Sequence, residues 1–323
     1  MKSQIFKTFV NRGWTKSLFA AILFTQIGQA QAGVIVTPAT NGNGISADLS
    51  MPSRQTAFTP IGDIVISEQQ TQDFAFTDRY WRTMILTAPD GWEFNPGVGK
   101  IIMNAPSDFR VTDLKVKEHT ITLRFCVRST ELLDVMTISG IEVRAVNGMI
   151  QTGNAYIHRS VNNPGTALVS NITPTRNTSG SGGTNFASLS LKPGKAQKLI
   201  FANKPYSTAE GKNLEGQTEI MTVDQFGNFS TEGLAAIQNV RVRLSSANSS
   251  LTGQTVLNIG TLGGNGRVTF SDLQVHETGM RKMIASAPSL SFAVTGDFLI
   301  YDDGVEAPAQ GLDADMMCVQ MAK

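Results

Sequence analysis

Residues 240–245 read Val-Arg-Val-Arg-Leu-Ser, a strict alternation of apolar and polar side chains. A period of two puts the apolar side chains on one face of a β-strand and leaves the arginines in water. The same alternation occurs at residues 121–126 (Ile-Thr-Leu-Arg-Phe-Cys) and at residues 290–295 (Leu-Ser-Phe-Ala-Val-Thr). We therefore expect half-buried strands at all three places, each with its first, third and fifth residues facing the core.

Short runs of this kind recur along the chain between Gly, Pro, Asn, Asp and Ser, whereas helical periodicity is scarce. Charged residues make up 16% of the sequence, below the usual level of about 25%. Thr, Ser, Asn and Gln supply the solvent-facing positions instead, as is common in exported β-proteins. This pattern is typical of β-sandwiches and barrels, so the sequence predicts an all-β protein with two β-sandwich domains.

One stretch rich in turn-forming residues divides the chain into two parts. Residues 173–188 read Thr-Pro-Thr-Arg-Asn-Thr-Ser-Gly-Ser-Gly-Gly-Thr-Asn-Phe-Ala-Ser, a composition typical of a flexible linker or a long loop. We therefore predict a first sandwich at residues 33–172, a linker at 173–188 and a second sandwich at 189–301. Residues 302–323, with acidic residues, Gly, Pro and a Met-rich end, are predicted to be a disordered tail.

The first 32 residues have the three parts of a signal peptide. Four basic residues precede a short apolar run: Lys2, Lys7, Arg12 and Lys16. The sequence Ala-Gln-Ala closes the segment at residue 32. The alternative is an uncleaved membrane anchor, but the apolar run has only about ten residues where a spanning helix needs about 20. We expect the protein to be exported to the periplasm, the cell surface or the medium, with no stable membrane span after residue 32.

The charge of the chain does not indicate a nucleic-acid partner. The whole sequence has a net charge of +1. The predicted signal peptide contains four basic residues and no acidic one, so the charge from residue 33 onward falls to −3. A slightly acidic chain has no basic excess with which to attract nucleic acid.

The sequence contains two cysteines, Cys126 and Cys318. Export to an oxidising compartment would permit a disulfide bond between them. Cys126 lies inside an apolar, strand-like run, however, and Cys318 lies in the predicted tail. We expect Cys126 to be a buried free thiol that packs as a small apolar side chain.

Three strings follow one another in the predicted second sandwich: residues 196–201 (Ala-Gln-Lys-Leu-Ile-Phe), 223–228 (Val-Asp-Gln-Phe-Gly-Asn) and 266–273 (Gly-Arg-Val-Thr-Phe-Ser-Asp-Leu). Together they resemble the immunoglobulin-like (Ig-like) repeats of bacterial exported surface proteins of the invasin and adhesin type. The resemblance implies a β-sandwich of about 100 residues. Asp224 and Asn228 have the chemistry of a turn; the alternative, a calcium site, needs six to eight oxygen ligands.

Two further strings lie in the first predicted sandwich, at residues 85–95 (Ile-Leu-Thr-Ala-Pro-Asp-Gly-Trp-Glu-Phe-Asn) and 138–144 (Ile-Ser-Gly-Ile-Glu-Val-Arg). They are similar to a β-rich module at the front of exported bacterial proteins. Pro-Asp-Gly at residues 89–91 predicts a tight turn. Trp92 and Phe94, two residues apart, should then point to one face of the next strand.

The sequence carries no recognisable catalytic or metal-binding pattern. His119, His158 and His276 have no second His or Cys at metal-ligand spacing. Neither a G-x-S-x-G elbow nor an H-E-x-x-H motif is present. We predict a non-enzymatic protein with no catalytic residue, no metal ligand and no cofactor.

The candidate contact residues are aromatic: Tyr80, Trp81 and Trp92. Tyr80 and Trp81 are adjacent and have an arginine on either side. Neighbouring residues of a strand face opposite sides, so one of the two rings is expected to point outward, where it could stack on a sugar ring or a partner's side chain. The alternative is that these rings simply pack in the core.

These observations favour a surface adhesion protein or a structural and interaction module, with an unknown protein or glycan partner at the cell surface. A first alternative is a carbohydrate-binding accessory module of the periplasm or secreted fraction. A second alternative is a hydrolase whose site follows no recognised motif. The Ig-like resemblance bears on the fold, and a fold alone does not determine a function.

Overall fold

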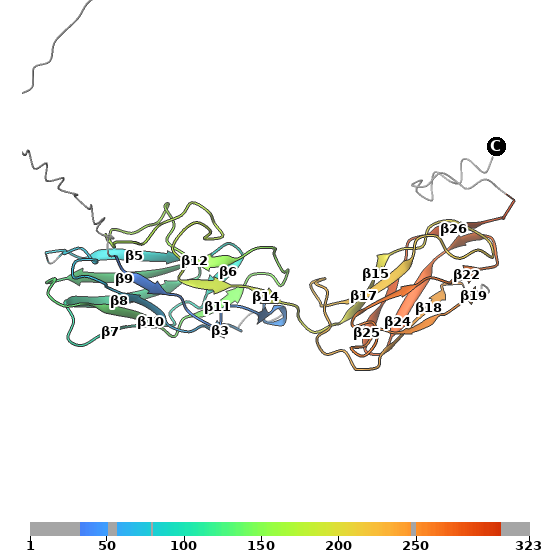
Figure 1. The fold of residues 1–323 in the computed structure, drawn as a ribbon, viewed down its shortest axis with the longest axis horizontal. Coiled ribbons are helices and arrows are strands. Elements are labelled where there is room, and N and C mark those ends of the chain that lie inside the picture. The colour runs from blue at the N-terminus through green and yellow to red at the C-terminus, as the bar shows by residue number, and fades with distance from the viewer. Residues whose placement is uncertain (1–32, 51–56, 79, 247–249, 305–323) are drawn as a thin grey trace, which may run out of the picture.

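The computed structural model describes residues 33–50, 57–78, 80–246 and 250–304. These residues form two β-rich modules that follow one another along the chain (Figure 1). The one helical element among them is a single 3-10 turn, η1 (Ala47–Leu49). The predicted all-β class is confirmed, and the described strands form two modules, each with its own core. The predicted signal peptide, Cys318 and most of the predicted tail lie outside the described residues.

The first module is a set of short strands with the bounds β1 (Ile35–Thr37), β2 (Ile45–Ser46), β3 (Thr59–Pro60), β4 (Ile64–Ser67), β5 (Arg82–Thr87), β6 (Trp92–Phe94), β7 (Lys100–Met103), β8 (Phe109–Lys117), β9 (Thr120–Val127), β10 (Val135–Ser139), β11 (Glu142–Ala145), β12 (Ala155–Ile157), β13 (Ala187–Leu189) and β14 (Leu191–Lys192). Three sheets have the strand orders β1-β4-β10-β7, β3-β11-β6 and β5-β9-β8. Two short pairs, β12-β13 and β14-β2, complete the module. All of these pairings are antiparallel except the one between β14 and β2.

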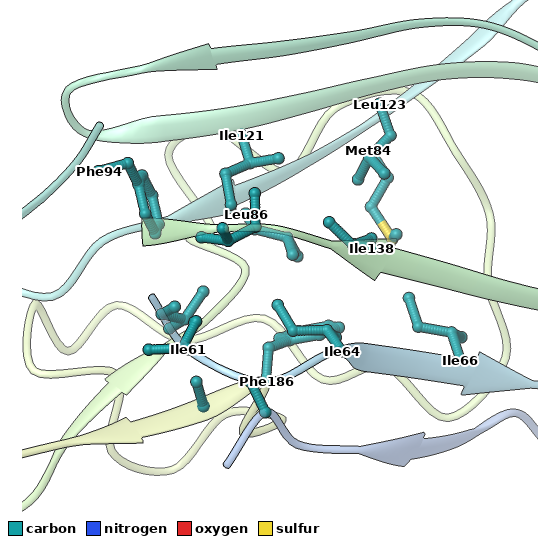
Figure 2. Close-up of a cluster of buried hydrophobic side chains, with 14 of the residues drawn as sticks. Ile61, Ile64, Ile66, Met84, Leu86, Phe94, Ile121, Leu123, Ile138 and Phe186 are labelled. Atoms are coloured by element: carbon teal, nitrogen blue, oxygen red, sulfur yellow. The ribbon is translucent and has the colours of Figure 1, made fainter. Parts of the chain in front are cut away.

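The core of the first module lies between the β5-β9-β8 sheet and the sheet that contains β4 and β10. Figure 2 shows the side chains of both sheets meeting: Met84, Leu86, Ile121, Leu123, Ile64, Ile66 and Ile138. All seven have no exposed surface. The predicted alternation at residues 121–126 is confirmed, because the first, third and fifth side chains all enter this core. Each fully buried side chain of this kind contributes about 1.5–3 kcal/mol relative to an exposed one.

Residues 173–188, predicted as a linker, instead form part of the first module. Phe186 is fully buried in the core of that module. Its backbone N–H donates to the carbonyl of Ile157 (2.9 Å), and its own carbonyl accepts from the N–H of Ala39 (2.8 Å). The Ser/Gly-rich turn therefore leads back into strand β13, which completes the core. The passage between the modules comes later, between β14 and the first strand of the second module, which begins at Lys198.

The strands of the second module have the bounds β15 (Lys198–Asn203), β16 (Thr208–Ala209), β17 (Thr218–Val223), β18 (Asn239–Leu244), β19 (Leu251–Thr252), β20 (Val256–Asn258), β21 (Arg267–Phe270), β22 (Gln274–Val275), β23 (Gly279–Arg281), β24 (Met283–Ala287), β25 (Leu290–Val294) and β26 (Phe298–Tyr301). The main sheet has the order β20-β18-β24-β25-β15-β17-β21, and β25 joins β15 through a short parallel contact. Two smaller sheets have the orders β16-β26-β23 and β19-β22. Side chains from the β20-β18-β24-β25 half and from the β15-β17-β21 half of the main sheet share one core.

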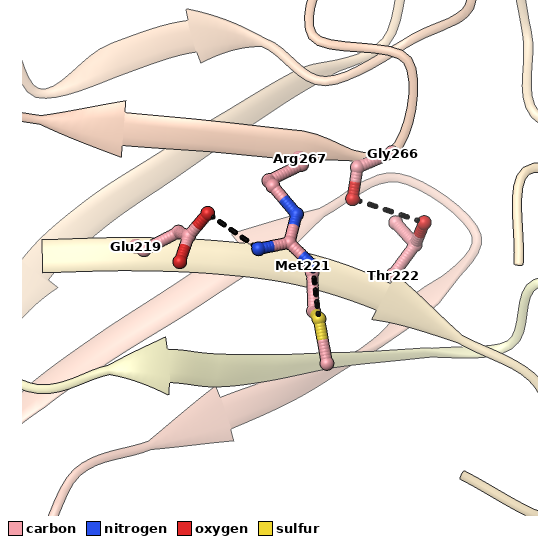
Figure 3. Close-up of polar contacts among 5 residues, drawn as sticks. All are labelled: Glu219, Met221, Thr222, Gly266 and Arg267. Atoms are coloured by element: carbon pink, nitrogen blue, oxygen red, sulfur yellow. Dashed lines mark hydrogen bonds and ion pairs between the residues drawn. The ribbon is translucent and has the colours of Figure 1, made fainter. Parts of the chain in front are cut away.

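Polar contacts tie strand β21 to its neighbour β17. Arg267 donates from Nη1 to Oε1 of Glu219 (2.8 Å), and its Nη2 lies 3.5 Å from Sδ of Met221 (Figure 3). The hydroxyl of Thr222 donates to the carbonyl of Gly266 (3.3 Å) just before β21 begins. Residues 266–273 are thus held in the sheet by side-chain contacts in addition to the strand pairing between β17 and β21.

The two remaining alternations have different outcomes. At residues 240–245 the prediction is confirmed: the apolar side chains are buried and both arginines are exposed. At residues 290–295 it is wrong, because Phe292 and Val294 are 66% and 46% exposed while Ala293 is buried. Leu290 packs against the core, and so does Ala293, three residues later. Between the pairs Ala285–Ala293 and Ala287–Leu290, β25 has two residues where β24 has one, and this extra residue changes the face on which the following side chains lie.

Candidate binding surface

Trp81 lies on the outer face of the β5-β9-β8 sheet, directly before β5. Because Arg82 pairs with Phe125, Trp81 comes beside Cys126, and Cys126 in turn pairs with Arg110. The Cζ atoms of Arg110 and Arg124 lie 5.7 Å and 5.3 Å from the centroid of the Trp81 ring. These are distances at which a guanidinium is attracted to an aromatic ring. Trp81 is half-buried and holds two arginines at the surface.

A hollow of about 510 Å³ lies beside this ring. That volume is within the range of about 300–1,000 Å³ typical of ligand pockets. Cys126, at its base, is buried and free. The described residues that line the hollow are Phe76, Asp78, Trp81, Arg110, Cys126 and Arg128.

The loop before β5 carries two exposed aromatic rings, and one of them, Phe76, lines the hollow. The N–H of Thr77 donates to the carbonyl of Val127 (3.3 Å), and the N–H of Val127 donates to the Thr77 hydroxyl (2.9 Å). The N–H of Tyr80 then donates to the carbonyl of Thr77 (2.8 Å), which closes a turn. The loop is thereby fastened to the end of β9, and Phe76 and Tyr80 are left 54% and 68% exposed.

An aromatic cluster supports the sheet from below. The ring of Phe74, fully buried, meets the ring of Phe109 edge-on at 4.7 Å and that of Phe125 at 6.0 Å. Phe109 and Phe125 are 5.3 Å apart. Such pairs contribute about 0.5–1.5 kcal/mol beyond their buried area. The packing fixes β8 and β9, which carry the arginines, against the loop that carries Phe76 and Tyr80.

Buried carboxylates anchor the loops at the same end of the module. Glu68 accepts the N–H of Phe74 and the N–H of Asp134, each at 2.9 Å. Burial raises the pKa of Glu68, although these two hydrogen bonds act in the opposite direction. Burial also raises the pKa of Asp134, and the nearby charge of Asp108 acts in the same direction. Both groups are acceptors for the backbone, so their role is to hold the loops.

Asp108 behaves differently although it lies beside the other two. Burial works to raise its pKa, but hydrogen bonds from Ser129 and from the N–H groups of Leu132 and Glu131 outweigh burial and lower that pKa. Its oxygens are therefore occupied by protein donors. Within the described ranges, no three His, Cys, Asp or Glu side chains are grouped so that they could hold a metal ion.

The outer face of the sheet is positively charged, although the chain from residue 33 onward has a net charge of −3. The strand register places Arg124, Lys115 and Lys117 on the same face as Trp81 and Arg110. All of these basic side chains are exposed. Two acidic side chains lie among them: Asp113 on this face and Asp78 at the rim of the hollow. The sheet thus presents a basic and aromatic surface to solvent.

Of the three candidate contact residues predicted from the sequence, Trp81 lies on this surface, and Tyr80, next to it in the chain, is exposed. Trp92 lies in β6 with 7% of its surface exposed and lines a separate pocket. The expectation that Trp92 and Phe94 share a buried face agrees with their burial, but Glu93 between them is buried as well. Arg110 and Arg124 are absent from the sequence-based candidates, since only strand pairing reveals that they meet Trp81. Arg128, which lines the same hollow, is absent from them too.

Comparison with known proteins was made at the level of sequence and of structure. No protein-family model matches the sequence, and no curated protein matches it. Within the described residues there is no helix that is both long and apolar enough to cross a membrane.

Several solved structures of bacterial surface proteins are similar to this chain. The D00-D0 domain of intimin is 10% identical, with a TM-score of 0.28, over 83% of this chain and 100% of that one. The Yersinia pseudotuberculosis adhesin InvE is 11% identical, with a TM-score of 0.23, over 84% of this chain and 61% of InvE. The Escherichia coli adhesin FdeC is 12% identical, with a TM-score of 0.22, over 84% of this chain and 63% of FdeC. Two of these neighbours, InvE and FdeC, are adhesins, the class of surface protein that the strings of the second module resemble.

Proposed function

We propose that this chain is an exported adhesion module that binds an anionic partner through the Trp81 surface. By this name we mean the exposed face formed by Phe76, Tyr80, Trp81, Arg110, Arg124 and Arg128. The observation that carries the proposal is the position of two guanidinium groups against one tryptophan ring. The module acts by binding rather than by catalysis, and its second sandwich serves as a spacer.

The chemistry of arginine selects the class of partner. A guanidinium presents a planar fork of N–H donors that matches a carboxylate, sulfate or phosphate group. The Trp81 ring restrains both guanidiniums before the partner arrives, which lowers the entropy lost on binding. Because Arg110 and Arg124 already contact the ring, Trp81 acts by positioning them rather than by stacking on a sugar. Exposed Phe76 and Tyr80 add apolar contact area of the kind that contributes most at interfaces.

Retention on immobilised heparin, a sulfated polysaccharide, tests the proposal. We expect Arg110→Gln to lower the affinity for heparin about tenfold, equivalent to ~1.4 kcal/mol. Arg241→Gln makes the same change of charge at an exposed strand position of the second module, and it should bind as the parent does. Equal loss of affinity in the two variants would mean that heparin responds to net charge alone and would overturn the proposal.

The role of the ring has its own test. Trp81→Ala removes no charge, yet it frees both guanidiniums from the ring, so we expect affinity for heparin to fall about threefold to tenfold. Near-ultraviolet circular dichroism and thermal unfolding would check that the first module remains folded. Unchanged affinity in a folded Trp81→Ala protein would contradict the positioning role.

A further inference from the structure

A second hollow, of about 220 Å³, lies at the turn before β6. The N–H of Trp92 donates to the carbonyl of Pro89 (3.1 Å), and Gly91 has a φ of +79°, which a residue with a side chain rarely adopts. This is the tight turn predicted at residues 89–91. The opposite wall is the loop of residues 147–154, between β11 and β12. We refer to this hollow as the turn pocket.

The polar lining of the turn pocket is almost entirely uncharged. Among the described residues that line it, Asp90 is the single charged one. The side chains of Gln151, Thr152 and Asn154 are exposed and make no hydrogen bond to any described residue. Nε2 of Gln151 lies 3.6 Å from the position that a Cβ on Gly91 would occupy. Amide and hydroxyl groups are therefore available at the rim on the loop side.

Apolar side chains complete the lining. They are Trp92 at the turn, Leu191, and Met149 on the loop, and Met149 is 62% exposed while Trp92 is nearly covered. A pocket with free amides on one wall and an aromatic edge on another suits a ligand that has both hydroxyl groups and an apolar face. A purely apolar ligand would strip water from the amides without replacing their hydrogen bonds, which costs free energy.

The loop wall is held in place without a ligand. The N–H of Met149 donates to Oδ1 of Asn147 (3.1 Å), and the N–H of Ile150 donates to Oδ1 of Asn228 (2.9 Å) in the second module. Since these bonds already order the backbone, a ligand does not have to order it on binding.

We infer that the turn pocket binds one uncharged sugar residue. Gln151 and Asn154 hydrogen-bond to its hydroxyl groups, and its apolar face lies against the Trp92 and Met149 wall. The volume lies below the range of about 300–1,000 Å³ for drug-sized ligands, so one ring is the appropriate size. An anionic sugar is disfavoured, because Asp90 is the one charged group in the lining and its charge is negative. This site is separate from the Trp81 surface and does not depend on it.

Nuclear magnetic resonance titration of the full chain with the methyl glycosides of glucose, galactose and N-acetylglucosamine tests the inference. We expect saturable shifts of the Gln151 and Asn154 side-chain amide signals with at least one glycoside, with a Kd of about 1 mM. Shifts that stay absent or do not saturate with all three would overturn it.

A matched pair of variants locates the binding. Gln151→Ala should weaken binding at least about fivefold (~1 kcal/mol), whereas Gln197→Ala, at an exposed glutamine of the second module, should leave it unchanged. Unaltered binding in folded Gln151→Ala and Asn154→Ala proteins would place the sugar elsewhere and would refute the site. Retention on heparin should not change in any of these variants, so failure here is distinguishable from failure of the proposed adhesion function.

Discussion

A nearly buried ion pair joins two neighbouring strands of the first module. Arg144 donates from Nη2 and Nε to Oε1 of Glu93, at 2.8 Å and 3.2 Å, and the two side chains are 8% and 11% exposed. Cζ of Arg144 also lies 4.2 Å from the centroid of the Phe58 ring. Nη1 of Arg144 is buried and has no hydrogen-bond partner among the described residues. The guanidinium therefore depends on Glu93 to compensate its charge.

Glu93→Ala should destabilise the first module by about 3–5 kcal/mol, because it leaves a buried positive charge without a counter-ion. Urea-induced unfolding measures the change. The double variant Glu93→Leu/Arg144→Met is the control, since it removes both charges and keeps apolar volume, and it should recover most of the loss. A single variant within about 1 kcal/mol of the parent would show that the pair contributes little.

Asp134 gives the first module a dependence on pH. Burial raises its pKa above the ordinary value of 3.8, so the folded protein holds the proton more tightly than the unfolded chain does. This contribution to stability is complete below pH 3.8 and is lost as the pH rises through the raised pKa. Asp134→Asn can still accept the N–H of Asp108 while it removes the charge. We expect the melting temperature of this variant to exceed that of the parent at pH 7, and the difference to shrink towards pH 4.

Thermal unfolding of both proteins between pH 4 and pH 7 measures that difference. Asp108, with its lowered pKa, contributes in the opposite sense and loses its stabilising effect as the pH falls below its ordinary value. Because the charges of Asp108 and Asp134 interact, the difference between the two proteins reports the Asp134 contribution together with this interaction. A difference that grows towards pH 4 would contradict the sign of the Asp134 contribution.

Among the structural elements, the turn after β17 is the most heavily hydrogen-bonded around one side chain. Asp224 is fully buried and accepts four N–H groups, from the backbone of Gly194, Phe226 and Asn228 and from Nδ2 of Asn228, at 2.8–3.0 Å. Both carboxylate oxygens of Asp224 are thus engaged in hydrogen bonds, in agreement with the turn chemistry expected for Asp224 and Asn228. With those oxygens engaged by N–H donors, the alternative of a calcium ligand pair finds no free ligand here.

Asp224→Ala should lower the stability of the second module by about 3 kcal/mol, because several buried N–H groups lose their acceptor together. Differential scanning calorimetry would follow the transition of that module. Asp272→Ala is a matched control: its exposed carboxylate accepts a single backbone N–H, that of Gln254, so its loss should cost under about 1 kcal/mol. Equal losses of stability in the two variants would show that the burial of Asp224 contributes no additional stability to the second module.

Sequence periodicity predicted strands correctly where one face is buried along the whole strand, as at residues 240–245. It failed at β25, because this strand has one residue more than its partner β24 between two successive pairs, and the alternation of apolar residues does not indicate that extra residue. Composition likewise misplaced residues 173–188, because Phe186 alone indicates core packing within a Ser/Gly-rich stretch. The partners of Trp81 could not be predicted, since Arg110 and Arg124 reach it through pairing between distant strands.

At the scale of the whole molecule, hydrogen bonds join the two modules. Oδ2 of Asp48 accepts the N–H of Lys195 (2.8 Å), and its Oδ1 accepts from Nε2 of Gln225 (3.1 Å). Asn228 donates from Nδ2 to the carbonyl of Gly148 (2.7 Å) and accepts the N–H of Ile150. These bonds connect the first module to the same turn that Asp224 organises. A spacer fixed in this way transmits the orientation of one module to the other.

Gly148 is the position at which this junction is most sensitive to added volume. A Cβ on Gly148 would lie 2.2 Å from ring atoms of Phe226, so Gly148→Ala forces the ring or the loop to move. We expect the parent to tumble as one body, with a common rotational correlation time for both modules in ¹⁵N relaxation, and Gly148→Ala to tumble as two bodies with shorter, unequal times. Gly296→Ala, where a Cβ meets nothing within 4 Å, should resemble the parent. Independent tumbling in the parent itself would refute a fixed junction, and the spacer role proposed for the second sandwich would then have to rest on a flexible connection.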